Sequence, residues 1–341
     1  MKAIVKAVLV VAVILVIIMF SAAGIAYSLN RAPGEENKAE HIFSVEKGES
    51  VSSIASRLEE LDLIRSKYFL RVLSKLKGTE GSFRAGSYLI QSGATSLAVH
   101  NTLVSGIEVM KKVTIPEGLS RTRLAVILDE GGIVAAEEFL EASEDKELLV
   151  SFSIKADSAE GFLFPDTYLF PEDYPADRVV KKMIDRFFDV IEDIAPGLDE
   201  ISGEEMMEKV ILASIIEREY VIPEEAPYMA SVFYNRLELD MRLQSCATVA
   251  YVLSEELGKE YPEKLTLKDL EVASEYNTYR NGGLPPGPIA NPGKVALSAV
   301  FYPADTEYLY FLLKDRETGS HEFTATYKEH IDAKNLFLKI K

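Results

Sequence analysis

Glu217 is an ionisable residue at the end of an apolar segment. It follows the run 210–216, Val-Ile-Leu-Ala-Ser-Ile-Ile, and precedes Arg218 and Glu219. On a helix that turns by about 100° per residue, Glu217 shares the apolar face with Ser214, whereas Glu219 lies on the opposite face toward water. A carboxyl group in an apolar wall binds its proton more tightly, which suits a general acid near neutral pH. The alternative interpretation is a helix-end glutamate that only marks where burial stops.

The other reactive residue types do not form a recognisable metal site. The sequence contains one cysteine, Cys246, and four histidines, at positions 41, 100, 321 and 330. Their spacings match none of the usual zinc motifs, and one cysteine cannot form a disulfide within the chain. We therefore predict no metal ion, and we interpret Cys246 as a small packing residue because no His motif accompanies it.

Acidic residues outnumber basic ones, with 54 Asp and Glu against 37 Lys and Arg, which gives a net charge of −17. A protein that binds nucleic acid needs a basic face to neutralise the phosphates. This charge balance therefore argues against a nucleic-acid partner.

The N-terminus has the pattern of a membrane anchor. Lys2 and Lys6 precede an uncharged apolar run that extends to Ala26. About 20 residues at roughly 1.5 Å rise each cross a hydrocarbon core of roughly 30 Å, and the flanking lysines favour a cytoplasmic N-terminus. A cleaved signal peptide is the alternative, although its apolar core usually has only about 7–15 residues. We predict a cytoplasmic tail at 1–6, a single transmembrane helix at 7–27 and a polar stalk at 28–40, with the rest outside the cytoplasmic membrane.

An internal repeat follows the stalk. Residues 43–70 align without gaps to residues 113–140, and seven of the 28 positions are identical. Each copy predicts a short strand, a glycine turn and two helices, the first of which has Ser50 or Ser120 as its N-cap.

We assign 41–108 to a LysM-like module, a small unit that binds chitin-like and peptidoglycan sugars, and 109–155 to a second repeat unit or connector. Between the copies, 85–90 predicts a strand and 96–103 a short helix. A packing module without sugar affinity is the alternative, because strand–glycine–serine–helix patterns are common.

Residues 156–341 change to longer helices, separated by loops rich in Pro, Gly, Asn and Tyr. The apolar spacing predicts helices at 176–194, 204–220, 224–239, 244–255 and 266–273, and a strand at 308–313. Together with the strands of the N-terminal half, this pattern predicts an α+β fold with an α-rich second part.

Four loop-like clusters in this part combine aromatic residues with amides and hydroxyls. They span 160–168, 235–249, 276–293 and 321–326. A carbohydrate groove needs such residues, because sugar faces stack on rings while hydroxyl groups bind amide and hydroxyl partners. Taken singly, each cluster is more often structural than functional.

Eight motifs in and around these clusters follow one another in a characteristic order. They are Glu160–Tyr168, Ala213–Glu219, Ala230–Leu237, Met241–Gln244, Tyr276–Tyr279, Gly283–Gly287, Ile289–Gly293 and His321–Phe323. In type and order they resemble the motifs of the MltG/YceG-like endolytic murein transglycosylases. The anchor and the LysM-like unit match that family's layout too, so the resemblance covers essentially the whole chain.

The resemblance implies a catalytic residue, a glycan cleft and a reaction. Glu217 would be the catalytic acid and base. The implied cleft residues are Glu160, Asp166, Tyr168, Gln244, Asn277 and Thr278, with His321 at the edge. Members of this family cut the MurNAc–GlcNAc β-1,4 bond inside nascent peptidoglycan strands without water, and they leave a 1,6-anhydro-MurNAc end. No metal or organic cofactor is implied, and the implied partners are glycan strands and the peptidoglycan synthases of the elongation machinery.

Three positions depart from the family pattern. Gln244-Ser-Cys-Ala-Thr248 stands where members commonly have Gln-Thr-Asp-Pro-Thr, Asp240 replaces a glycine, and Glu275 replaces a proline. A cleft-side Asp and a stiffening Pro are therefore missing, which concerns substrate affinity more than reaction class.

Two other functions remain open. A non-catalytic peptidoglycan-binding or scaffold protein of the cell envelope would also carry the anchor and the LysM-like module. A glycoside hydrolase would need a second carboxylate across the cleft, for which Asp166 and Glu160 are the candidates.

Overall fold

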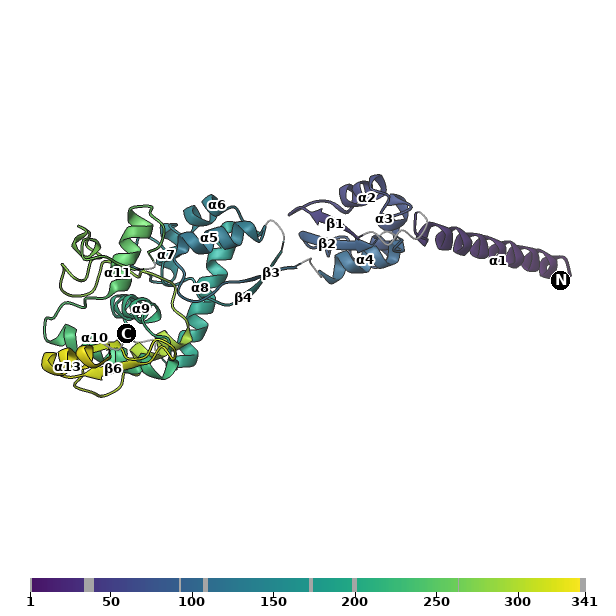
Figure 1. Ribbon diagram of the computed structural model, residues 1–341. Coiled ribbons are helices and arrows are strands. Elements are labelled where there is room, and N and C mark those ends of the chain that lie inside the picture. Colours follow the sequence, from purple (N-terminus) through teal and green to yellow (C-terminus); the bar gives the residue numbers. More distant parts are fainter. Residues whose placement is uncertain are drawn as a thin grey trace. The chain divides into compact units, whose positions relative to one another are not determined.

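The chain divides into two compact units, Met1–Lys111 and Lys112–Lys341, each with its own hydrophobic core. The computed structural model describes residues 2–33, 40–91, 93–106, 110–171, 174–197, 201–262 and 264–337. Figure 1 shows the course of the chain through both units, which form a helix-rich α+β fold as predicted.

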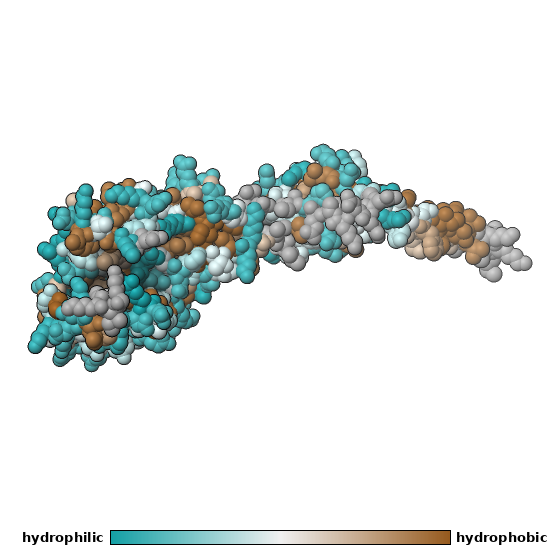
Figure 2. Space-filling model, in the orientation of Figure 1, coloured by the Kyte–Doolittle hydropathy of each residue, from teal (hydrophilic) through white to brown (hydrophobic). Residues whose placement is uncertain are grey.

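The first unit begins with the long helix α1 (Lys2–Asn30). Its residues Leu9–Asn30 are apolar and numerous enough to cross a membrane, and residues 9–28 are exposed in the isolated chain (Figure 2). The helix continues into the predicted stalk. Asn30 accepts a hydrogen bond from the N–H of Leu97 at 2.9 Å, so the end of α1 is fixed to the helix that begins at Ser96. Residues 34–39 of the stalk lie outside the described residues.

A two-stranded sheet and three helices complete this unit. Strand β1 (Glu40–Val45) pairs antiparallel with β2 (Gly86–Gln91). The helices are α2 (Val51–Glu60), α3 (Lys67–Leu76) and α4 (Ser96–Ser105). Phe43 and Tyr88 from the strands pack with Leu58 and Leu70 from the helices in one core. Ser50 caps α2 as predicted, by accepting a hydrogen bond from the N–H of Ser53.

The next stretch repeats the order of strand, helix and helix. It contains β3 (Met110–Thr114), α5 (Arg121–Glu130) and α6 (Ala136–Ala142). The turn glycines of the two stretches, Gly48 and Gly118, both have a positive φ, 82° and 73°. Residues 112–155 belong to the second unit, where α7 (Lys146–Ser151) follows and β3 pairs with β4 (Thr167–Pro171).

The body of the second unit is a group of packed helices. They are α8 (Ala176–Ile194), α9 (Gly203–Glu217), α10 (Ala226–Glu238) and α12 (Lys294–Phe301). Helix α9 contacts both α10 and α12, and its residues Met206–Ile216 are almost all buried. The uninterrupted apolar run before Glu217 is therefore that of a helix surrounded by protein.

The remaining elements are short. They are η2 (Pro223–Glu225), α11 (Cys246–Tyr251), the π-helical turn η3 (Val252–Glu256), η4 (Asp269–Glu271), β5 (Tyr310–Leu313), β6 (His321–Thr324) and α13 (Tyr327–Phe337). Strands β5 and β6 pair antiparallel.

Two predicted helices in this part were wrong in extent. The segment 266–273 contains only the single turn η4, because its apolar residue Leu267 is 85% exposed and no core receives it. Helix α9 ends at Glu217 rather than at residue 220, since the N–H groups of Arg218 and Glu219 close tighter turns onto Ile215 and Ile216.

Candidate active site

Glu217 is the last residue of α9, and its side chain is half-buried. Its Oε2 accepts a hydrogen bond from the backbone N–H of Gly293 at 3.0 Å, and the Tyr220 hydroxyl shares a further hydrogen bond with the carboxyl group. Burial, with a smaller contribution from the charge of the nearby Glu117, raises the pKa of Glu217 to about 7 against the opposing effects of Gly293 and Arg218. A carboxyl group with this pKa is a suitable proton donor near neutral pH.

The loop before α5 lies against the side chain of Glu217. Nη1 of Arg218 donates to the carbonyl oxygen of Gly118 at 3.0 Å, and the guanidinium lies 4.9 Å from the ring centre of Tyr261. A Cβ on Gly118 would lie 3.4 Å from Cγ of Glu217, in direct contact. Arg218 therefore ties the end of α9 to the Gly118 loop, beside Glu217.

Glu219 does not point toward water, in contrast to the prediction. Although the residue as a whole is half-buried, its carboxyl group is buried, and Oε1 accepts a hydrogen bond from Ser245 Oγ at 2.5 Å. Burial raises the pKa of Glu219. The helical angle that placed it outside no longer applies, because α9 has ended two residues earlier.

His321 lies on β6 and belongs to the surroundings of Glu219. Its Nδ1 is 2.8 Å from Oε2 of Glu225, and its backbone N–H donates to Oε1 of the same residue at 3.0 Å. His321 also lowers the pKa of Glu219 through its charge interaction. The histidine therefore connects η2, which carries Glu225, to the turn that follows α9.

Asn277 and Thr278 are buried, and their side chains form hydrogen bonds with backbone groups instead of facing an open groove. The Asn277 amide donates to the carbonyl oxygens of Leu270 and Val272 at 2.9 and 2.8 Å. Thr278 Oγ1 accepts from the N–H of Ser245 at 3.0 Å. These contacts hold the segment 270–279 against the start of α11.

Gln244 is exposed beside them and has a φ of 54°. Its N–H donates to the carbonyl oxygen of Thr278 at 3.1 Å, which leaves the side chain on the surface. Among the residues predicted for the cleft, Gln244 is thus one whose side chain a ligand could reach.

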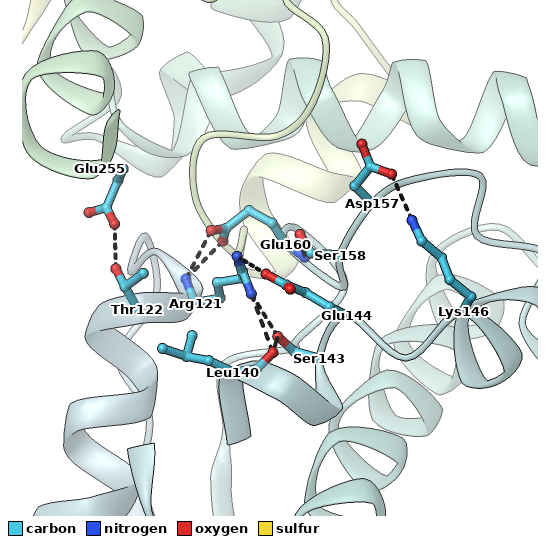
Figure 3. Close-up of polar contacts among 10 residues, drawn as sticks. All are labelled: Arg121, Thr122, Leu140, Ser143, Glu144, Lys146, Asp157, Ser158, Glu160 and Glu255. Carbon is cyan, nitrogen blue, oxygen red and sulfur yellow. Dashed lines mark hydrogen bonds and ion pairs between the residues drawn. The ribbon is translucent and has the colours of Figure 1, made fainter. Parts of the chain in front are cut away.

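Glu160 is buried and caps α5 (Figure 3). Both of its carboxyl oxygens accept from the N–H of Arg121 at 3.0 Å, and Oε1 also accepts from the amide of Asn291 at 3.0 Å. Burial raises the pKa of Glu160 to about 8. Ser120 occupies the N-cap position, but its hydroxyl donates to Glu255 instead of capping the helix, so the predicted capping role falls to Glu160.

Asp166 and Tyr168 have partners away from Glu217. Asp166 Oδ2 accepts from Nε of Arg186 on α8 at 2.8 Å. Tyr168 is buried, and its hydroxyl donates to the carbonyl oxygen of Phe164 at 2.6 Å. Burial raises the pKa of this hydroxyl. Tyr168 is therefore a core residue, and Asp166 joins β4 to α8.

Four residues of the site were missed by sequence reasoning: Glu117, Tyr220, Asn291 and Gly293. Asn291 is buried and joins three loops, since its Oδ1 accepts from the N–H groups of Gly161 and Leu163 at 2.9 and 3.0 Å. The available signals were the Pro-Glu-Gly turn at 116–118, which read as a simple turn, and the motif Ile289–Gly293, in which no single residue was given a role.

A model of the YceG-like family matches residues 43–335 of the chain. The chain belongs to this family. A relative in Bacillus subtilis (strain 168), an endolytic murein transglycosylase, is 32% identical over 325 residues, which cover 90% of this chain and 87% of the relative. An endolytic murein transglycosylase of Streptococcus pneumoniae serotype 2 (strain D39 / NCTC 7466) is 26% identical, and the match covers 89% of this chain and 60% of the relative.

A solved structure is also similar to this YceG-like chain. The crystal structure of a putative yceG-like protein from Listeria monocytogenes matches with a TM-score of 0.56 and 31% sequence identity. The match covers 87% of this chain and 99% of that chain.

The segment 244–248, for which the sequence predicts a departure from the family pattern, lies at the start of α11. Ser245 is the N-cap of α11, and its Oγ accepts from the N–H of Ala247 at 3.2 Å while it donates to Glu219. Cys246 is exposed, and its Sγ lies 3.1 Å from the Tyr279 hydroxyl. Ser245 thus joins this segment to the turn after Glu217.

Two hollows in the second unit share Tyr251 as a lining residue. The narrow one is lined by Gly118 and Arg218, the neighbours of Glu217. The other has a volume of about 470 Å³, and its walls include Tyr276, Pro288 and Glu160. The rings of Tyr251 and Tyr276 lie 5.0 Å apart. In the part of the chain that the structure describes, no three His, Cys, Asp or Glu side chains are arranged to hold a metal ion.

Proposed function

We propose that this YceG-like protein is an endolytic murein transglycosylase that cuts the MurNAc–GlcNAc β-1,4 bond of nascent peptidoglycan strands. The observation that carries the proposal is Glu217, a half-buried carboxyl group whose pKa is raised to about 7 at the end of a buried helix. Relatives of this chain are endolytic murein transglycosylases, which supports the same substrate class.

One carboxyl group serves the whole reaction. Glu217 donates its proton to the glycosidic oxygen as the bond from that oxygen to C1 of the MurNAc residue breaks. The resulting carboxylate takes the proton of the C6 hydroxyl while O6 bonds to C1. Glu217 is thus protonated again by the C6 hydroxyl, a 1,6-anhydro-MurNAc end forms, and no water is consumed. A pKa near the working pH favours both proton transfers.

The other predicted site residues have different roles in this proposal. Gln244, whose side chain is exposed, contacts the glycan strand. Asn277, Thr278 and His321 position the segments around it and around Glu219 through the hydrogen bonds described above. Glu160 shapes the loops through Arg121 and Asn291.

The ring pair of Tyr251 and Tyr276 is the proposed stacking surface for sugars further along the strand. Both rings line the 470 Å³ hollow, and Tyr251 also lines the narrow hollow beside Gly118. Apolar sugar faces favour such rings.

The proposal extends to the rest of the chain. Helix α1 would anchor the protein once in the cytoplasmic membrane with the second unit outside, since its apolar length suffices to span. The first unit would be a LysM-like glycan-binding module, related by an ancestral repeat to β3, α5 and α6. Peptidoglycan synthases of the elongation machinery are the proposed partners, because nascent strands are the substrate.

Digestion of uncrosslinked glycan strands with the full chain in detergent tests this function. Mass spectrometry should find anhydro ends, one water lighter than reducing ends. Glu217→Gln should lower the rate by about 10²–10⁴-fold while the protein stays folded. The matched control is Glu208→Gln, an exposed glutamate on the same helix, which should keep full activity. Binding of strands without any cleavage by the wild-type protein would instead support a scaffold function.

A further inference from the structure

Glu117 is a second carboxyl group beside Glu217. It lies in the loop between β3 and α5, and its side chain packs onto Gly293, where an added Cβ would overlap the carboxyl group and lie 2.8 Å from Cγ of Glu117. The N–H of the same Gly293 donates to Glu217 at 3.0 Å. The two carboxyl groups therefore flank one residue, Glu117 at its Cα and Glu217 at its nitrogen.

The charge of Glu117 acts on its neighbours. It raises the pKa of Glu217 and contributes to the raised pKa of the Tyr220 hydroxyl. The other groups that face Glu217 are Arg218 and Tyr220 from its own turn and the N–H of Gly293 at the start of α12. Arg218 lowers the pKa of Glu217 and so opposes the effect of Glu117, but its guanidinium also donates a hydrogen bond to the carbonyl oxygen of Gly118.

Glu117 is exposed, in contrast to the other acidic residues proposed for the cleft. Glu160 is buried beneath Arg121 and Asn291, and Asp166 pairs with Arg186. Two carboxyl groups this close repel each other, which gives no stability to the fold. Cleavage of a glycosidic bond, by contrast, places positive charge on C1 and the ring oxygen in the transition state, where a nearby negative group is favourable.

We propose that Glu117 is a second functional carboxylate of this site, which forms no bond to the substrate and stabilises the positive charge that develops at C1 as the glycosidic bond breaks. The inference rests on the proposed function. Every proton transfer remains with Glu217. The charge of Glu117 favours the protonated form of Glu217 before the bond breaks.

A carboxyl titration tests the pair without any need for activity. Carbon-13 NMR of labelled glutamates follows the Glu217 signal, which is identified by its loss in Glu217→Gln. Its midpoint near pH 7 should move to lower pH in Glu117→Gln and stay in place in Glu117→Asp, which keeps the charge. Glu130→Gln, an exposed glutamate of α5, is the control and should not move it. An unchanged midpoint in Glu117→Gln overturns the proposal.

Kinetics on glycan strands test the role in the reaction. Glu117→Gln should lower kcat on the order of 10²-fold and leave KM within about twofold, because the interaction exists only in the transition state. The alkaline fall of kcat/KM should shift to lower pH together with the NMR midpoint. Full kcat in Glu117→Gln contradicts the proposal, as does a fall in kcat with no shift of the profile. If the wild-type protein itself cleaves nothing, the proposed function fails, whereas the titration still reports on the pair.

Discussion

Glu217 owes its raised pKa first to burial, and only then to the charge of Glu117. Burial was predictable because the run 210–216 is apolar on every side, which places the end of the helix inside the protein. The place of Glu219 was not predictable in this way. A side chain's direction depends on where the helix ends, and that is set by the turns at Arg218 and Glu219 together with the partner Ser245, which is 26 residues away.

The pH dependence of cleavage follows from the pKa of Glu217. The acid must hold its proton when the glycosidic bond breaks, and the protonated fraction falls as the pH rises through about 7. The value of kcat/KM should therefore decline above about pH 7, and this decline should be missing from the residual activity of Glu217→Gln. A rate that climbs steadily from about pH 5 to pH 9 would instead assign Glu217 the role of a base alone.

At the scale of elements, Glu160 and Asn291 join segments that are far apart in the sequence. Glu160 caps α5, and Asn291 binds the N–H groups of Gly161 and Leu163. Sequence periodicity predicted α8 with its correct ends because one apolar face suffices to define it. It could not predict that Ser120 would lose its capping role to Glu160, since that contact spans 39 residues.

The stability of the second unit should depend on pH through Glu160. Its pKa is raised to about 8 in the folded state, from about 4.5. Its contribution to stability is thus fully present below about pH 4.5 and is lost as the pH rises through about 8, at up to about 1.4 kcal/mol per pH unit. Urea unfolding of Glu160→Gln should show a smaller loss of stability between pH 5 and pH 8 than the wild-type protein. Glu217, whose pKa is also raised, adds a loss of stability with rising pH to the wild-type protein and to Glu160→Gln alike. Equal losses in the two proteins would contradict the assignment.

Gly161 is required where the loop after α7 passes under the Pro-rich segment. Its φ is +86°, and an added Cβ would lie 2.6 Å from Pro288 and 2.7 Å from Val210. Gly161→Ala should therefore destabilise the second unit by about 1–3 kcal/mol or more in thermal unfolding. The matched control is Gly282→Ala, where an added Cβ meets nothing within 4 Å and φ is not positive. This variant should stay within about 0.5 kcal/mol of wild type. Similar effects of both variants would show that the close approach at Gly161 is unimportant.

At the scale of the molecule, each copy of the predicted repeat contributes apolar residues to a different one of the two cores. Leu58 lies in the core of the first unit, and its aligned partner Leu128 lies in that of the second, each with 0% of its surface exposed. The sequence pattern predicted this pairing of apolar positions. It did not predict that residues 112–155 join the helical body, because that depends on packing such as the contact of α6 with α8.

The aligned leucines provide a matched pair of variants. Leu58→Ala should lower the stability of residues 40–106 by about 2–5 kcal/mol, and Leu128→Ala should do the same to the second unit, because each leaves a cavity in one core. Hydrogen exchange, followed by mass spectrometry of peptides from each unit, distinguishes the two. Loss of protection in the second unit on Leu58→Ala, to the same extent as in the first, would contradict the division into two cores.

The most direct test of the central claim is the source of the oxygen at the new sugar end. Glycan strands are cleaved by the wild-type protein in water enriched in heavy oxygen, and the fragments are weighed. If the Glu217 carboxylate takes the proton of the C6 hydroxyl while O6 bonds to C1, the new ends are anhydro-MurNAc and contain no label from water. Fragments that carry one labelled oxygen at the reducing end would mean that water attacks C1, and the protein would be a hydrolase.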